Sequence, residues 1–359
     1  MKNISIFFPA YNEAENIKET VLKAKKVIEP IFSDFEIIIV NDGSADRTGE
    51  IAEELAKKDR RIKVVHHPKN LGYGAALVSG FNASQKDLVF FTDCDLQFDI
   101  SEIKKLLKYI PEYDVVIGYR SPRRDSFMRL VNAWGWKWLN RFLFDLKVKD
   151  IDCAFKLFKK EAIKSIEIKS RGAMISAEML IKLFQKGCKI KEVPVRHLPR
   201  KTGFPTGAKP KVILRAFYEL FKMFPELASR GRREFIKYCL IGVLNTVLDW
   251  AIYLGLTRIF IFWAEHFIYA KTISYIVGII NSYALNRLWT FRSKDKKLII
   301  QFFKFFVVSG LALFMNIGTM YLVVRQWHLS DILGLALATL ASLIFGFSLN
   351  KYWTFGKEK

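Results

Sequence analysis

Four long apolar stretches near the end of this 359-residue chain constrain its fold more than any other feature. Each is about 18 to 26 residues long, which is enough for a helix to cross a hydrocarbon core of ~30 Å. Buried helices of a soluble domain would not produce four such lengths in succession. We therefore predict four transmembrane helices, at Phe235–Leu256, Ile268–Leu288, Ile299–Val324 and Ile332–Leu349.

Charge is distributed unevenly along the chain. Charged residues make up 73 of the first 233 positions but only 19 of the last 126. This contrast predicts a soluble domain at residues 1–210, an amphipathic interfacial segment at 211–233 and an all-α membrane domain at 234–359. The four cysteines form no C-x-x-C pair, which is typical of reduced structural cysteines in a cytosolic domain.

Basic residues flank the apolar stretches on one side. They precede the first, separate the second from the third, and follow the fourth. The positive-inside rule then places the soluble domain and both termini in the cytoplasm, as part of a multi-pass protein of the cell membrane. The run Ile4–Phe8 is too short to be the apolar region of a signal peptide.

The apolar part contains an internal repeat. Asn286–Phe291 reads N-R-L-W-T-F and Asn350–Phe355 reads N-K-Y-W-T-F, 64 residues later. This repeat predicts two duplicated helical hairpins. Polar residues inside or near the spans have two interpretations, interhelical hydrogen bonding or a path for lipid headgroups; they are Asn245, Asp249, Asn281, Asn286 and Asn316.

In the first part of the chain, short apolar runs alternate with segments of helical spacing, such as Glu15–Ile28 and Thr48–Lys57. This alternation predicts a Rossmann-like α/β domain with a mostly parallel sheet. The expected strands are Ile4–Phe8, Glu36–Val40, Ile62–Val65, Leu88–Thr92, Val115–Gly118 and Ala154–Phe158.

Polar clusters follow three of these expected strands, at Pro9–Glu13, Asn41–Thr48 and Asp93–Gln97. Ligands of such sheets bind at the carboxyl ends of the strands, so the three clusters are expected to converge on one ligand. Asp93 and Asp95 supply carboxylate oxygens, which suit a hard divalent cation that completes its shell with diphosphate oxygens.

These motifs carry a family resemblance. The P-x-Y-N-E opening, the D-G-S-x-D-x-T turn and the D-x-D-x-Q strand end resemble family 2 glycosyltransferases of the GT-A fold, specifically polyprenyl-phosphate sugar synthases such as dolichyl-phosphate mannose synthase and the GtrB-like enzymes. The N-x-x-W-T-F repeat resembles the GtrA-like four-helix membrane domain. Together the two resemblances cover nearly the whole chain.

The resemblance implies a nucleotide-sugar site and a metal site. It assigns donor binding to Pro9, Tyr11, Glu13, Asp42, Asp93, Arg200 and Lys201. It assigns Mg²⁺ or Mn²⁺ to Asp93, Asp95 and Gln97. This sequence departs from the family at Asn41, where most members have Asp.

An acceptor that is a lipid phosphate is already anionic, so it needs cations to hold it in line rather than a protein base. The resemblance implies that Arg120 and Arg129 bind that phosphate, and with Asp95 they form the expected catalytic set. The family serine four residues after Arg129 is Ala133 here, and Asn132 is the expected substitute.

Two features have alternative interpretations. The loop Asn70–Ala76 either brings its backbone close to the nucleotide or is a plain loop-to-helix turn. The amphipathic stretches around residues 127–138 and 213–224 either lie in the headgroup plane or pack against the α/β core. His66 and His67 lack ligand spacing and are interpreted as polar residues at a strand end.

These expectations describe an inverting, metal-dependent transfer of a hexose, mannose or glucose, from a GDP- or UDP-sugar to polyprenyl or dolichyl phosphate. A processive polysaccharide synthase is disfavoured because no Q-x-x-R-W string occurs. The alternatives are a lipid-phosphosugar translocator with a regulatory soluble domain and another membrane family 2 glycosyltransferase with a different acceptor. We expect no nucleic-acid partner, because membrane flanks and phosphate-facing loops account for much of the net charge of +22. A homo-oligomer is compatible with the sequence.

Overall fold

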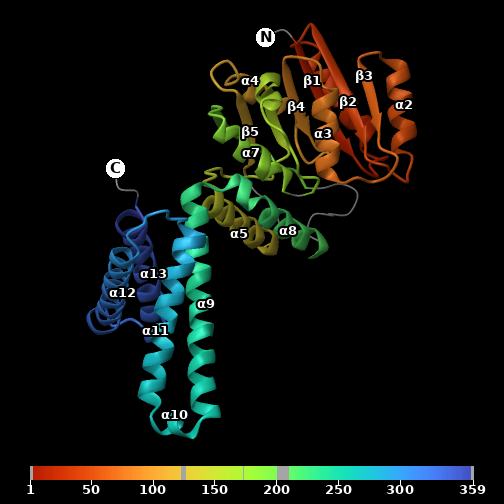
Figure 1. Cartoon of the computed structure of the whole chain (residues 1–359). Helices are drawn as coiled ribbons and strands as arrows, with labels where there is room; N and C mark the ends of the chain where they lie inside the picture. Colours follow the sequence, from red (N-terminus) through yellow and green to blue (C-terminus); the bar gives the residue numbers. More distant parts are fainter. Residues whose placement is uncertain (1–2, 123–126, 173, 200–209, 357–359) are drawn as a thin grey trace. The chain divides into compact units, whose positions relative to one another are not determined.

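The computed structural model describes residues 3–122, 127–172, 174–199 and 210–356. The chain divides into two compact units, Met1–Ala228 and Ser229–Lys359 (Figure 1). The first unit is built on a β-sheet covered by helices, and the second is helical. Each unit is described by itself below.

The first unit contains a seven-stranded sheet in the order β3-β2-β1-β4-β6-β5-β7. β6 is antiparallel to its neighbours β4 and β5, and the other strand pairs are parallel. The predicted mostly parallel α/β fold is thus confirmed. The strands are β1 Asn3–Ala10, β2 Asp34–Asn41, β3 Ile62–His66, β4 Leu88–Thr92, β5 Val115–Arg120, β6 Phe155–Lys159 and β7 Ile190–Val195.

β7 is the strand that the sequence analysis missed. It contains Pro194, which cannot donate a backbone hydrogen bond and therefore argues against a strand assignment. In the structure β7 lies at the edge of the sheet and pairs only with β5, where a missing donor is tolerated.

Apart from α5 and α8, the helices of the first unit lie along the sheet (Figure 1). The close approach of α3 to β1 requires glycine at position 80, because a Cβ there would lie 2.2 Å from the ring of Phe7. Besides α5 and α8, the helices of this unit are α1 Ile17–Ile28, α2 Thr48–Lys58, α3 Tyr73–Ala83, α4 Ile103–Leu107, α6 Lys160–Lys164 and α7 Ile175–Gln185, with a short 3₁₀ turn at Ile100–Glu102.

The amphipathic stretches form helices α5 Phe127–Phe144 and α8 Pro210–Leu227, which contact each other. Trp136 packs edge-on against Phe217 at 6.1 Å, and Phe144 lies 6.2 Å from Phe224. The described face of α8 that packs inward contains Ala216, Leu220, Met223 and Leu227. The large apolar side chains that are at least 50% exposed on the two helices are Trp134, Trp138, Phe142, Leu214, Tyr218 and Phe221. We call these six residues the α5–α8 apolar surface.

The second unit contains α9 Arg230–Ile259, α10 Ile261–Glu265, α11 Phe267–Leu285, α12 Leu298–Tyr321 and α13 Asp331–Leu349. Within the described chain, three helical stretches are long and apolar enough to cross a membrane, namely Arg230–Ile259, Leu298–Gln326 and Asp331–Thr354. Four spans were predicted. The second expected span does form a helix, α11, but it is not among these three, and it contains polar residues such as Lys271 and Asn281.

The sequence repeat has a structural counterpart. Both copies form a single π-helical turn, Asn286–Thr290 at the end of α11 and Asn350–Thr354 at the end of α13. The phenylalanines that follow them, Phe291 and Phe355, stack on one another with ring centroids 4.7 Å apart. The repeated motif therefore joins the ends of the two hairpins.

Candidate active site

The three polar clusters follow strands that lie side by side. β1 pairs in parallel with β2 on one side and with β4 on the other. Ala10, at the end of β1, lies opposite Asn41, at the end of β2. Because the carboxyl ends of parallel neighbours meet at one edge, Tyr11–Glu13, Asp42 and Asp93–Asp95 all begin from the same edge of the sheet.

The turn after β1 is fixed by the loop that follows β2. Asn12 has a φ of 56°, and its backbone N–H donates to Ser44 Oγ at 3.0 Å. Its side-chain Oδ1 accepts from the N–H of Ala45 at 2.8 Å. Tyr11, which is 44% exposed, therefore projects from a turn held on both sides.

The other two residues of this motif differ in their surroundings. Glu13 is half-buried; its N–H donates to Thr48 Oγ1 at 2.8 Å, and its Oε2 accepts from Asn16 Nδ2 at 2.7 Å. Pro9 is buried within β1, opposite Val40. Pro9 thus lies inside the sheet, whereas Tyr11 and Glu13 lie beyond its edge.

Asp42 is the centre of a buried hydrogen-bond network. Its Oδ1 accepts from the N–H of Leu71 at 2.9 Å, and its Oδ2 accepts from the N–H of Gly72 at 2.9 Å. His67 Nδ1 lies 2.7 Å from the same Oδ1, and His67 Nε2 lies 2.9 Å from Ser79 Oγ. The carboxylate expected beside the nucleotide thus holds the glycine-rich loop in place.

The D-x-D-x-Q segment makes a tight turn after β4. Asp95 is 5% exposed, and its Oδ1 accepts from the N–H of Gln97 at 3.1 Å. Gln97 Nε2 donates to the carbonyl of Leu198 at 3.2 Å, so this amide faces the segment after β7. Asp93, one position before Cys94, accepts from the hydroxyl of Tyr73 at 3.0 Å.

Two neighbours of these carboxylates stay protonated at neutral pH. Burial of its hydroxyl and the negative charge of Asp93 raise the pKa of Tyr73 well above its usual value, although 36% of the residue is exposed. Burial also raises the pKa of the Cys94 thiol, and the charge of Glu13 adds to this shift. Tyr73 is therefore a hydrogen-bond donor, and Cys94 is unsuited to bind a metal as a thiolate.

The oxygen-bearing side chains after β4 supply some, but not all, of the ligands that a divalent cation needs. Among the described residues, no cluster of three or more His, Cys, Asp and Glu side chains could hold a metal ion by itself. Asp93 and Asp95 offer hard carboxylate oxygens, the ligand type that Mg²⁺ and Mn²⁺ prefer. A cation there would take its remaining ligands from substrate, which is the usual arrangement for Mg²⁺ with phosphates.

Arg120 forms a two-pronged ion pair with Asp150. Its Nε donates to Asp150 Oδ2 at 2.7 Å and its Nη2 donates to Oδ1 at 2.8 Å. The two side chains are 9% and 5% exposed. The guanidinium expected at the acceptor phosphate is thus oriented by a carboxylate that the sequence analysis did not select.

A second group that the sequence analysis missed is Lys156, on β6, which is 0% exposed. Its Nζ donates to the carbonyls of Ile151 and Cys153, and it shapes the turn that carries Asp150. Burial lowers the pKa of Lys156, and the negative charges of Asp150 and Asp152 oppose that shift. The only sequence signal was a basic residue within an apolar strand, F-K-L-F.

The remaining predicted residues are less well defined. Asn132 is exposed on α5, one turn before Trp136. Arg129 lies in α5, but its side chain is outside the described residues. Arg200 and Lys201 also lie outside the described residues. The structure therefore brings together the β1, β2 and β4 clusters and leaves the acceptor residues as predictions.

Two protein families match this chain. Residues 5–167 match glycosyl transferase family 2, and residues 237–357 match the GtrA/DPMS transmembrane domain. The first match includes the strand ends described above, and the second includes both copies of the repeat.

Similar proteins come from several organisms. Glycosyltransferase AglD of Haloferax volcanii is 31% identical over 69% of this chain, but the chain spans only 41% of its length. A Bacillus subtilis relative is 34% identical, and the chain spans 53% of it. Dolichol-phosphate mannosyltransferase of Pyrococcus furiosus is 28% identical, and the alignment covers 80% of this chain and 81% of that protein.

The fold of the first unit also has solved counterparts. Glucosyl-3-phosphoglycerate synthase from Mycobacterium tuberculosis, in a complex with Mn²⁺, UDP-glucose and phosphoglyceric acid, superposes with a TM-score of 0.50 at 18% identity. The superposition covers 62% of this chain and 80% of that chain. At this level of identity, the comparison supports the fold of the unit.

Proposed function

Because this chain belongs to glycosyl transferase family 2 and carries a GtrA/DPMS transmembrane domain, we propose that it transfers a hexose, mannose or glucose, from a nucleoside diphosphate sugar to a polyprenyl phosphate. The observation that carries the proposal is the convergence of the turn after β1, Asp42 and the Asp93–Asp95 pair at one edge of the sheet. The Pyrococcus furiosus and Mycobacterium tuberculosis proteins named above support a lipid phosphate acceptor and a nucleotide-sugar donor, respectively.

In this proposal Asp93 and Asp95, with Gln97, hold Mg²⁺ or Mn²⁺ beside the donor diphosphate. The cation, when bound, would neutralise charge that develops on the leaving diphosphate. Tyr11 and Glu13 contact the nucleoside. Pro9 supports them from inside β1, and Asp42 supports them by holding the glycine-rich loop. Arg200 and Lys201 contact the diphosphate.

The acceptor phosphate binds Arg120, which Asp150 orients, together with Arg129 and Asn132. An ionised phosphate oxygen attacks the anomeric carbon without a protein base, and in-line displacement inverts that centre. The sugar–phosphate bond forms as the bond to the donor diphosphate breaks, and the nucleoside diphosphate departs. The contribution of the protein is orientation and positive charge.

The α5–α8 apolar surface supports placement of this chemistry at a membrane. Its six exposed residues include two tryptophans and a tyrosine, side chains that favour the membrane–water interface. We propose that this surface contacts the cytoplasmic leaflet, with both termini in the cytoplasm. A polyprenyl chain then stays in lipid while its phosphate reaches the site.

In a direct test, membranes that contain the protein are incubated with polyprenyl phosphate and with radiolabelled GDP- and UDP-hexoses. The expected result is a labelled lipid whose formation requires Mg²⁺ or Mn²⁺ and one donor. Label that stays in water-soluble products with every donor, or lipid labelling without polyprenyl phosphate, would exclude the proposed reaction.

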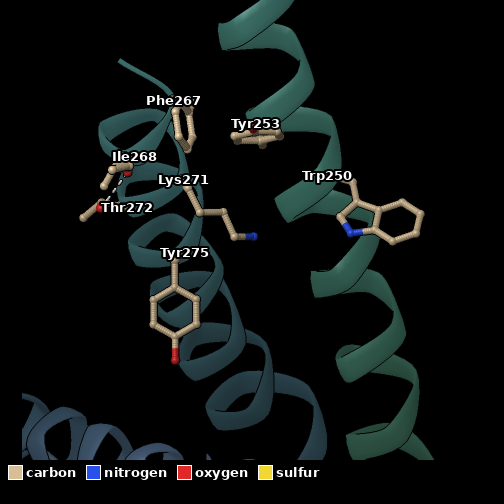
Figure 2. Close-up of a pocket in the computed structure, with 7 residues that line it drawn as sticks. All are labelled: Trp250, Tyr253, Phe267, Ile268, Lys271, Thr272 and Tyr275. Carbon is tan, nitrogen blue, oxygen red and sulfur yellow. Dashed lines mark hydrogen bonds between the residues drawn. The ribbon is translucent and has the colours of Figure 1, made fainter. Parts of the chain in front are cut away.

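One observation supports a second function, translocation of the lipid phosphosugar by the second unit. A pocket of about 630 Å³ lies between α9 and α11, lined mostly by aromatic side chains and by Lys271 (Figure 2). Lys271 Nζ pairs with Asp249, and ionisable residues within membrane helices often mark substrate pathways. Translocation predicts that glycolipid still crosses vesicle membranes when Asp93 and Asp95 are both replaced.

A further inference from the structure

Tyr73 is the first residue of α3, and its side chain reaches the edge of the sheet where β4 ends. Its hydroxyl donates to Asp93 Oδ1 at 3.0 Å. None of the assignments made from the sequence or from the relatives involves this residue. It links the glycine-rich loop, whose role was open, to the first carboxylate of the proposed metal pair.

The backbone on both sides of Tyr73 is fixed. On one side, the carboxylate of Asp42 accepts hydrogen bonds from the N–H groups of Leu71 and Gly72, each at 2.9 Å. Gly72 has a φ of 99°, in the region that favours glycine, and this conformation directs the chain into α3.

On the other side, Gly74 approaches another segment too closely for a side chain. Its N–H donates to the carbonyl of Arg171 at 3.2 Å, and a Cβ at this position would lie 2.6 Å from the carbonyl carbon of Arg171. Tyr73 is therefore held between two anchored residues, and its hydroxyl has a defined position relative to β4.

A carboxylate that binds a metal must present an oxygen in the right direction. Partners that hydrogen-bond to a ligating group orient it, and their loss commonly weakens metal binding by roughly 10- to 100-fold. A hydroxyl that donates to Oδ1 limits rotation of the Asp93 carboxylate.

We propose that Tyr73 is a positioning residue that orients Asp93 toward the divalent cation. The inference rests on the proposed function, because that function places the cation at Asp93 and Asp95. It makes the glycine-rich loop part of the metal site through the path Asp42, Leu71–Gly72, Tyr73 and Asp93.

The test measures Mn²⁺ binding to the full-length protein in detergent by electron paramagnetic resonance of free Mn²⁺, with UDP and with GDP. Tyr73→Phe removes one hydroxyl and keeps the ring. We expect its dissociation constant for Mn²⁺ to rise roughly tenfold, the lower end of the usual range. At saturating Mn²⁺, kcat should stay within about twofold of wild type, because the chemical step is unchanged.

The matched control is Tyr109→Phe, which removes a hydroxyl from another partly exposed tyrosine, whose ring packs edge-on against Tyr113. Tyr73→Leu removes the ring as well. Positioning by the hydroxyl predicts equal loss of Mn²⁺ affinity for Tyr73→Phe and Tyr73→Leu, with unchanged Tm for Tyr73→Phe. Packing by the ring predicts that only Tyr73→Leu is impaired, which would overturn the proposal.

The binding readout separates the two proposals. If wild-type protein binds Mn²⁺ but makes no lipid product, the proposed function fails, and the effect of Tyr73→Phe on Mn²⁺ affinity still decides the inference. If wild-type protein makes the product and Tyr73→Phe binds Mn²⁺ as tightly as Tyr109→Phe does, only the inference fails.

Discussion

Buried charges in the first unit and polar pairs between helices α9 and α11 of the second unit differ in how many partners they have. In the first unit the buried charges of Asp42 and Lys156 each have several partners: Asp42 accepts from two backbone N–H groups and contacts His67, and Lys156 donates to two carbonyls. In the second unit the half-buried Asn245 and Asn281 face each other across α9 and α11, and Nδ2 of Asn281 donates to Oδ1 of Asn245 at 2.7 Å.

This difference teaches where each unit is sensitive to substitution. A charge with several buried partners leaves all of them unsatisfied when it is removed, which is costly. A hydrogen bond between membrane helices contributes only about 0.6 to 2 kcal/mol, because the separated helices find other partners. Substitutions of Asp42 or Lys156 should therefore cost more stability than substitutions in the polar pairs between α9 and α11.

The largest expected effect is on activity, at the edge of the sheet. Asp95→Asn removes a negative charge from the proposed metal pair, and we expect transfer to fall by at least about 1000-fold with an unchanged Tm. The matched control is Asp87→Asn, which changes an exposed carboxylate before the opposite end of β4. Turnover of Asp95→Asn close to that of Asp87→Asn would remove Asp95 from the reaction.

The next effect is on stability and tests the first half of the comparison directly. Lys156→Met leaves the carbonyls of Ile151 and Cys153 without their donor and removes positive charge near Asp150, so we expect a loss of about 3 kcal/mol. Hydrogen exchange of the β6 amides in the full-length protein measures this loss of unfolding free energy.

The control for Lys156→Met lies on the same strand. Lys159→Met breaks a surface ion pair with Asp114, at 3.1 Å, and should cost no more than about 1 kcal/mol. Equal losses for the two variants would mean that burial of Lys156 has no energetic consequence, contrary to the comparison.

A smaller effect is expected in the second unit. Lys271→Met breaks the pair with Asp249 across α9 and α11, and we expect a loss of about 1 kcal/mol, measured by hydrogen exchange of these helices in detergent. Lys304→Met is the control, because Lys304 lies over the ring of Trp353 in the other hairpin. If Lys271→Met is as destabilising as Lys156→Met, the contrast between the units is wrong.

The smallest effect concerns a partly exposed network of the first unit. Hydrogen bonds from Arg61, together with Lys25, hold the pKa of Asp59 well below its usual value of about 3.9. The ionised form is therefore the stabilising one: its contribution is complete above about pH 4 and is lost as the pH falls toward the lowered pKa. Asp59→Asn should lower stability by about 0.5 kcal/mol at pH 7.

Thermal unfolding of wild type and Asp59→Asn between pH 7 and pH 3 measures the pH dependence. The difference in Tm between the two proteins should shrink as the pH falls below about 4. A difference that stays constant over this range would show that the carboxylate contributes through packing rather than charge.

Much of the fold could be predicted from local patterns. The six expected strands form at or near their predicted positions, because each is a short apolar run that must be buried in a sheet. β7 was not predicted, and it contains Pro194, a residue that a strand tolerates at the edge of a sheet. The second predicted span forms α11 but is not among the three stretches that are long and apolar enough to cross a membrane, and it contains Lys271 and Asn281 among its apolar residues.

The candidate site was predictable where its residues follow strands in sequence. Asp42, Asp93 and Asp95 could be selected because parallel strands direct their carboxyl ends to one edge. Tyr73 and Asp150 could not be selected from the sequence. Tyr73 contacts Asp93, which is 20 residues away, and Asp150 contacts Arg120, which is 30 residues away. Such pairings depend on how the elements pack, and spacing along the chain does not reveal them.

The sequence by itself determined the division into a charged α/β part and an apolar helical part, the strand-end motifs and the repeat, because hydrophobic periodicity and charge density are local properties. Only the tertiary structure decided which groups those motifs contact. It placed Asp42 under the glycine-rich loop, paired Arg120 with Asp150 and brought Tyr73 to Asp93, because hydrogen bonds need a separation of about 3 Å that folding alone creates.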